Sequence, residues 1–134
     1  MRMPNIFISH QWRYSDEYYT LIEKFNSLGW NHVDYSVPQH DSFDLTKKTL
    51  ITEALREQVR QCNFFIVFAR MASGNSEWIQ KEIEFAVRWD KPILGVKPWG
   101  YTGNIPSIIT QSVTFPIVGF NTPSIIKIIE RELS

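Results

Sequence analysis

Short, almost continuously apolar runs alternate with longer amphipathic segments along this chain of 134 residues, and this alternation restricts the fold more than any other feature. Such runs are typical of strands buried on both faces, as in a parallel sheet. We expect strands within the ranges Asn5–Ser9, Asn31–Tyr35, Asn63–Ala69, Pro92–Val96 and Val113–Val118. Helical spacing of apolar residues predicts helices over Asp16–Leu28, Thr49–Gln61, Ser76–Trp89 and Pro123–Leu133. The order predicts an α/β fold with a doubly wound, five-stranded parallel sheet and helices on both of its faces.

Residues that start and stop helices mark the ends of these segments. Gly29 follows the first helical segment and is expected to end it. Thr122, which precedes a proline, is expected to be the N-cap of the last helix. The connection Lys97–Ser112 is rich in proline and glycine, which predicts a loop with at most a short helix near Ile108.

The composition excludes several classes of partner and site. Fourteen basic residues balance fourteen acidic ones, and this zero net charge argues against nucleic acid. No apolar run approaches the roughly 18–20 residues of a membrane span, and the first residues lack the apolar core of a secretory signal. Cys62 is the single cysteine, so an intrachain disulfide is ruled out, and we expect it to be a small core residue. We therefore expect one cytoplasmic domain, residues 1–134, with neither membrane nor nucleic acid as a partner.

Several cofactor and catalytic motifs are missing from the chain. No Gly-x-Gly-x-x-Gly follows the first predicted strand, and no Gly-x-x-x-x-Gly-Lys-Ser/Thr occurs, which argues against dehydrogenases and P-loop NTPases. The three histidines are not at a helical spacing that suggests a metal. The chain has no Gly-x-Ser-x-Gly elbow, although a Ser-His-Asp set stays open.

The third predicted helix carries an acid within a stripe of aromatic residues. Its members lie at i, i+4, i+7 and i+11, and they are Trp78, Glu82, Phe85 and Trp89. Desolvation among rings would make Glu82 a candidate for function. Pairing with a nearby arginine or lysine at the helix start is an equally good structural interpretation.

Four loops follow the predicted strands, at the sheet edge where ligands bind in folds of this kind. They are His10–Ser15, Ser36–Lys48, Arg70–Asn75 and Lys97–Ser107. His10 and Trp12 are placed to meet a ligand, but a solvated histidine and a packed tryptophan are slightly favoured by spacing alone. Lys97 is suited to a phosphate and Trp99 to stacking on a base, and ordinary loop packing is the alternative for both. Tyr35 opens a polar segment for which a plain connection is the commoner case, and a lid or a protein contact is the functional alternative.

Taken together and in order, the motifs of this chain resemble one known family. Each motif is weak alone, but their spacing is specific from Asn5 to about Ile129. The motifs are Ile6–Trp12, Asp34–Pro38, Leu55–Gln58, Trp78–Ile83, Lys91–Gly100 and Val118–Asn121. The sequence is similar to TIR-like domains, and most of all to the TIR subunit of the bacterial Thoeris anti-phage defence system. The resemblance implies a flavodoxin-like sheet with strand order 2-1-3-4-5.

The resemblance also implies an activity and a site. Enzymatic TIR domains cleave NAD between nicotinamide and ribose, and Thoeris members convert it into a signal nucleotide that a partner effector protein reads. A cyclic ADP-ribose-type molecule or an ADP-ribose conjugate is the expected product. The family's Trp-x-x-x-Glu motif falls on Trp78 and Glu82, which makes Glu82 the expected catalytic residue. The residues expected to line the nucleotide pocket are Ser9, His10, Trp12, Tyr35, Trp78, Lys97 and Trp99.

Under this interpretation NAD is the substrate, and neither a cofactor nor a metal is expected. A phage-derived trigger and a homo-oligomer are further partners consistent with it. The second-strand loop lacks the Arg-Asp and Pro-Gly features of animal signalling TIR domains.

Two other functions stay open. One is a non-catalytic interaction module that signals by self-assembly, and the other is a nucleoside deoxyribosyltransferase-like enzyme with a glutamate nucleophile.

Overall fold

A parallel sheet of five strands forms the centre of the computed structural model, which describes residues 1–9, 15–36, 48–70 and 76–134. Its strand order is β2-β1-β3-β4-β5, so the predicted order 2-1-3-4-5 is confirmed. The strands are β1 (Asn5–Ser9), β2 (Val33–Asp34), β3 (Phe64–Phe68), β4 (Ile93–Lys97) and β5 (Val118–Gly119). Because β1 and β3 pair in register from Ile6↔Phe64 to Ser9↔Val67, their carboxyl ends meet at one edge.

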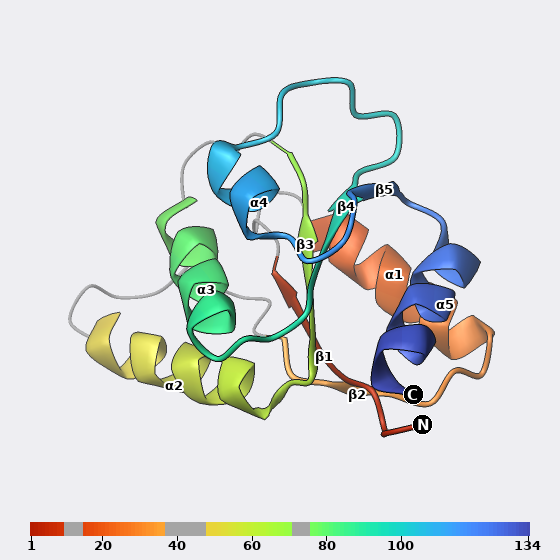
Figure 1. The fold of residues 1–134 in the computed structure, drawn as a ribbon, viewed down its shortest axis with the longest axis horizontal. Helices are drawn as coiled ribbons and strands as arrows, with labels where there is room; N and C mark the ends of the chain where they lie inside the picture. Colours follow the sequence, from red (N-terminus) through yellow and green to blue (C-terminus); the bar gives the residue numbers. More distant parts are fainter. Residues whose placement is uncertain (10–14, 37–47, 71–75) are drawn as a thin grey trace.

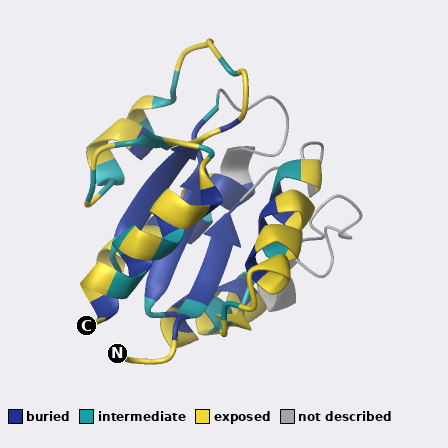
Figure 2. Ribbon diagram, turned by 90° about the vertical axis from the view of Figure 1, so that its right-hand side faces the viewer, coloured by how far each residue is buried: buried dark blue, intermediate teal, exposed yellow. Residues whose placement is uncertain are grey.

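Five helices cover the sheet in two layers, among the described residues. The helices α1 (Ser15–Ser27) and α5 (Thr122–Leu133) lie on one face, and α2 (Lys48–Gln61), α3 (Ser76–Arg88) and α4 (Ser107–Ser112) lie on the other (Figure 1). Side chains of β1 alternate between the two layers, since Ile6 and Ile8 pack with α1 and α5 whereas Phe7 packs with α2 and α3. The buried sheet between exposed helix faces is plain in Figure 2.

The last predicted strand differs most from the structure. The expected range Val113–Val118 forms a ladder only from Val118 onward, and the residues before it run irregularly over the sheet. They approach β4 closely at Gly95, where a Cβ atom would lie 3.0 Å from Ile117 Cγ1. Pro116 also lacks the N–H that a ladder needs. Packing, together with two hydrogen bonds between Thr114 and Ile93 at 2.9 and 3.0 Å, therefore holds this run against β4 in place of a regular ladder.

The helix ends confirm one prediction and correct another. Gly29 adopts a left-handed conformation with φ 64° two residues after the end of α1, as its predicted stop role requires. Thr122 is not the N-cap of α5, so that prediction was wrong. Asn121 takes this role, because its Oδ1 accepts a hydrogen bond from the backbone N–H of Ser124 at 3.0 Å. The Thr122 side chain is left buried, and in the described part of the chain its Oγ1 has no hydrogen-bond partner.

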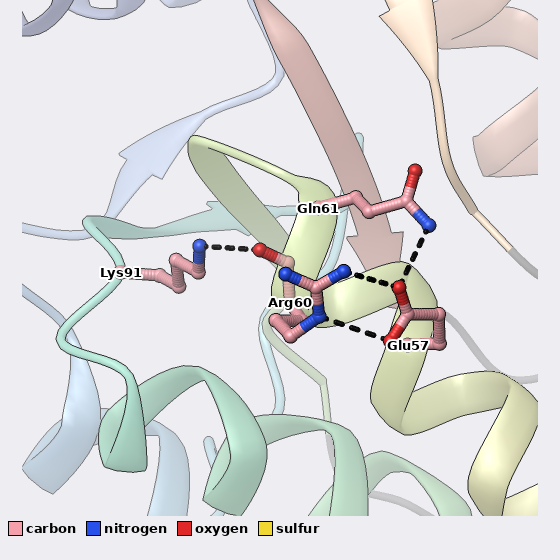
Figure 3. A network of polar contacts seen from close by, with 4 residues as sticks. All are labelled: Glu57, Arg60, Gln61 and Lys91. Atoms are coloured by element: carbon pink, nitrogen blue, oxygen red, sulfur yellow. Dashed lines mark hydrogen bonds and ion pairs between the residues drawn. The ribbon is translucent and has the colours of Figure 1, made fainter.

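The carboxyl end of α2 is tied to the turn that follows α3 (Figure 3). Lys91 Nζ donates to the backbone oxygen of Arg60 at 2.7 Å, which places a cation at exposed helix carbonyls. Glu57 accepts from Arg60 Nε at 2.9 Å and from Gln61 at 3.3 Å. Directly beyond this end lies Cys62, which is 1% exposed and a core residue as predicted. Burial raises the pKa of its thiol to about 12.

Within the ranges that the structure covers, no helix has both the length and the apolar character needed to cross a bilayer. In those same ranges, no group of three histidine, cysteine, aspartate or glutamate side chains is arranged to hold a metal ion.

Candidate active site

A buried carboxylate meets a buried hydroxyl where α3 packs against the end of β1. Ser9 Oγ donates a hydrogen bond to Glu82 Oε1 at 2.7 Å. The two residues are 73 positions apart in sequence, and they are 0% and 1% exposed. Burying a carboxylate is costly unless hydrogen bonds stabilise it, so this contact makes the placement of Glu82 tolerable.

The amphipathic pattern of α3 explains why an acid lies there. Trp78, one turn before Glu82, is also 1% exposed, and Ile83 is packed in the same buried cluster. Farther along the stripe, the rings of Phe85 and Trp89 stack with centroids 5.8 Å apart and are only half-buried. The end of the stripe nearest the carboxyl edge of β1 is therefore the fully buried one. Glu82 is not part of an ordinary solvated helix face.

The pair lies at the topological switch point of the sheet. From β1 the chain passes through α1 to β2 on one side, and α2 then leads across the other face to β3. Ser9, the last residue of β1, is in register with Val67 of β3. In doubly wound sheets, ligands bind in the crevice that opens at the carboxyl ends of such diverging strands. Ser9 and Glu82 thus occupy the position where this fold class places its sites.

A second polar network fixes the backbone beside Ser9. The Tyr18 hydroxyl donates to Asp34 Oδ2, and the backbone N–H of Ser36 donates to Asp34 Oδ1 at 2.9 Å. Ser36 Oγ in turn accepts from the backbone N–H of Ile8 at 2.8 Å. The residues after β2 are thereby held against β1, one residue before Ser9. Burial, and next the bond to Asp34, raise the pKa of the Tyr18 phenol above its ordinary value.

Replacement of Tyr18 by phenylalanine tests this network. We expect the variant to lose about 1.5 kcal/mol of unfolding free energy at neutral pH, the size of a hydrogen bond to a charged group. A raised phenol pKa stabilises the folded protein below the ordinary tyrosine value and ceases to do so as the pH rises through the folded value. The wild type should therefore lose more stability than Tyr18→Phe above pH ~10.

Chemical denaturation at pH 7 and pH 11 measures both effects. Tyr19→Phe is the matched control, because Tyr19 is the adjacent residue and is 45% exposed. Equal alkaline losses in wild type and Tyr18→Phe would show that the phenol does not hold this network.

The structure places the other predicted site residues in several different surroundings. Tyr35 is half-buried and packs against the cluster that contains Trp78, on the Glu82 side of the sheet. Lys97 is exposed at the end of β4. Trp99 is 92% exposed and lines a groove with α1 and α5, on the other side of the sheet. The predictions for His10 and Trp12 fall outside the described residues.

Sequence reasoning did not single out the network of Tyr18, Asp34 and Ser36 as part of the site. The signal was present, because a short strand ends in an acid, Asp34, a serine follows two residues later, and the neighbouring strand ends in Ser9. Only the fold shows that Tyr18, from a helix, completes the set.

A single carboxylate held in this way has a limited range of chemistry. It can stabilise positive charge that develops on a bound sugar ring, and it can accept hydrogen bonds from the ring hydroxyls. Because protein side chains surround it, such electrostatic stabilisation is stronger than in water. The geometry thus suits the departure of a neutral leaving group from an anomeric carbon.

Known proteins share the sequence pattern and the fold of this chain. A family model described as "Thoeris protein ThsB, TIR-like domain" matches residues 7–102. The search of curated proteins found no match. Among solved structures, the Clostridium botulinum CMP N-glycosidase BcmB is similar with a TM-score of 0.56 and 15% identity, covering 97% of this chain and 99% of that one. A 2-deoxyribosyltransferase from Bacillus psychrosaccharolyticus has a TM-score of 0.63 and 11% identity, covering 90% and 89%. At these identities the two structures share the fold.

Proposed function

Because the chain belongs to the family of Thoeris ThsB TIR-like domains, we propose that it acts in anti-phage defence by cleaving NAD at the nicotinamide–ribose bond. Glu82 is the catalytic residue of this proposal. The observation that carries it is the buried hydrogen bond between Ser9 Oγ and Glu82 Oε1 at the switch point of the sheet. Family membership supports the role in defence, and the geometry of the acid supports the chemistry.

The proposed reaction needs little more than one well-placed acid. The bond between ribose C1′ and the nicotinamide nitrogen breaks, and its electron pair leaves with nicotinamide as a neutral base. The ribosyl group gains oxocarbenium character, which the Glu82 carboxylate stabilises. A hydroxyl of the same molecule, or another small nucleophile, then adds to C1′ and loses its proton to solvent. No general acid is required, since the leaving group departs uncharged.

The product is proposed to be a cyclic ADP-ribose-type nucleotide or an ADP-ribose conjugate that a partner effector protein reads. Exclusion of bulk water favours capture by a nucleophile other than water. Trp78, fully buried one turn before Glu82, supports this part of the proposal because it excludes water from one side of the acid.

Nicotinamide release, separated by chromatography, tests the reaction. Purified protein and extracts of phage-infected cells are compared for wild type and Glu82→Gln, since a trigger from infection belongs to the proposal. Cytidine monophosphate and free deoxynucleosides are assayed in parallel, because the similar structures are those of a CMP N-glycosidase and a 2-deoxyribosyltransferase. Base release from these compounds without NAD turnover would contradict the proposal in favour of a nucleoside enzyme. Defence that survives Glu82→Gln would favour a non-catalytic module.

Ser9→Ala tests the hydroxyl that holds the acid. Its removal takes one donor from a buried carboxylate, which costs about 1–3 kcal/mol. We expect kcat to fall about tenfold to a hundredfold with a small change in KM. The reason is that the position of the acid affects the stability of the transition state more than the binding of the substrate. Ser27→Ala is the control, since the Ser27 hydroxyl donates to a backbone oxygen on the exposed side of α1. An unchanged kcat in Ser9→Ala would separate Ser9 from the chemistry.

A further inference from the structure

A groove of about 610 Å³ runs along α1, on the face of the sheet opposite Glu82, and is bordered by the start of α5 and the loop after β4. The helices α1 and α5 lie side by side on this face (Figure 1). Two large apolar side chains line the groove and stay open to solvent, since Trp99 is 92% exposed and Leu28 is 57% exposed. Apolar surface gathered in one exposed groove is typical of an interaction site.

The side of α1 that lines the groove carries a row of residues four positions apart. They are Asp16, Thr20, Lys24 and Leu28, and all four are exposed. Residues at this spacing lie one above another on a helix, so the row forms one ridge of its surface. The backbone N–H of Leu28 donates to the oxygen of Lys24 at 3.1 Å, which continues the helical pattern to the end of the row. Asp16 and Lys24 are about 12 Å apart along the helix axis.

The order of chemical types along the groove is self-complementary. Because the parallel strands all end at one edge, the loop after β4 lies where α1 begins, so Trp99 lines the groove at the Asp16 end. From this end the groove presents an aromatic ring, an acid, the small hydroxyl residue Thr20, a base and the aliphatic Leu28. A second copy turned end to end therefore places an acid opposite each base and an apolar side chain opposite each apolar one.

The charges of the row are available for such pairing. Within the part of the chain that the structure describes, neither Asp16 nor Lys24 takes part in an ion pair. The neighbouring acid Glu17 differs, because its carboxylate is paired with Arg70 of the same chain. Asp16 and Lys24 are thus the charges in the groove that a contact between molecules can use.

We propose that this groove is the interface of a homodimer, in which the α1 ridges of two copies pack side by side about a two-fold axis at Thr20. Asp16 of each copy pairs with Lys24 of the partner subunit, and the Trp99 ring of each copy covers Leu28 of the partner subunit. Two-fold symmetry makes every such contact twice. Ridges of this kind commonly pack with helix axes at about 50° to each other. The small side chain of Thr20 lets the ridges approach at the centre.

The dimer is expected to be weak and reversible. Its apolar centre consists of Trp99 and Leu28 from each copy, and a tryptophan buries at most about 250 Å². These side chains account for less than the roughly 1,200–2,000 Å² of a stable interface, so we expect a dissociation constant between about 1 μM and 1 mM. The groove lies across the sheet from Glu82, and the dimer does not depend on the proposed NAD cleavage.

Sedimentation equilibrium of the full chain over about 1 μM to 1 mM tests the dimer. Asp16→Lys and Lys24→Asp each put like charges opposite one another, so each variant alone is expected to associate at least about tenfold more weakly. An equal mixture of the two variants restores both opposite-charge pairs and should associate as the wild type does. Trp99→Ala should also weaken association about tenfold. Glu53→Lys, an acid-to-lysine change at an exposed position of α2, is the matched control and should associate normally.

The mixing experiment separates the interface from folding, because a misfolded variant would not regain association when a second variant is added. Three results would overturn the proposal. They are a wild type that is monomeric at every concentration, unchanged association in both single variants, and no rescue of association in their mixture. The last would exclude the end-to-end arrangement. None of these measurements involves NAD, so the dimer and the proposed reaction can fail separately.

Discussion

Glu82→Gln is expected to abolish nicotinamide release while the protein stays folded. The substitution keeps the volume of the side chain and an oxygen that can accept a hydrogen bond from Ser9 Oγ, which lies 2.7 Å from Glu82 Oε1 in the wild type. It removes the negative charge that stabilises the ribosyl transition state. Losing one such preorganised group lowers kcat by about 10²–10³ or more. Under the proposed mechanism no other group replaces that charge, so turnover should fall below detection.

The matched control for this prediction lies on the same helix. Glu84→Gln makes the same change of charge two residues away, where Glu84 is exposed and accepts from Gln80 at 3.2 Å. We expect Glu84→Gln to retain wild-type turnover, and both variants to unfold at nearly the wild-type temperature. Wild-type NAD turnover by Glu82→Gln under activating conditions would remove Glu82 from the mechanism.

Phe65→Ala is expected to cause the largest loss of stability. Phe65 is fully buried in β3, and its ring stacks on that of Phe7 with centroids 5.3 Å apart and planes 4° from parallel. Truncating a buried phenylalanine costs about 3–5 kcal/mol through lost burial and the remaining cavity. That is a large part of the roughly 5–15 kcal/mol that stabilises a domain, and it corresponds to a Tm lower by about 10–20 °C.

Thermal unfolding followed by circular dichroism measures this effect, with Trp99→Ala as the comparison. Trp99 is a larger aromatic residue, but at 92% exposed it contributes little to the core, so its removal should change stability by less than about 0.5 kcal/mol. Equal Tm values for Phe65→Ala and Trp99→Ala would mean that the centre of the sheet is not packed as described.

The parts of the fold that the sequence predicted well are those dictated by local pattern. The runs within β1, β3 and β4 are apolar at successive positions, and they are buried because helices cover both faces. The resemblance, rather than the pattern, supplied the strand order. The last strand was misjudged because an apolar run packs equally well without a ladder. The cap of α5 was misjudged because Asn121 and Thr122 are both good caps, and only the backbone angles choose between neighbours.

The candidate site was predictable in part. Helical spacing identified Glu82 as unusual, but it supported a functional and a structural interpretation of this residue equally well. The contact with Ser9 spans 73 residues and depends on the packing of α3 against β1, which no local pattern contains. The same limit applies to Trp99, whose motif is compatible with a nucleotide site but which lies with α1 and α5, across the sheet from Glu82.

A crystal structure of Glu82→Gln with NAD bound would test the central claim most directly. The variant should trap the intact substrate, and the atom to locate is C1′ of the nicotinamide ribose. We predict that this ribose lies against residue 82, within hydrogen-bonding distance of its side chain, at the end of β1 where Ser9 stands. A nicotinamide ribose bound elsewhere, with residue 82 still enclosed by protein and out of its reach, would contradict the account.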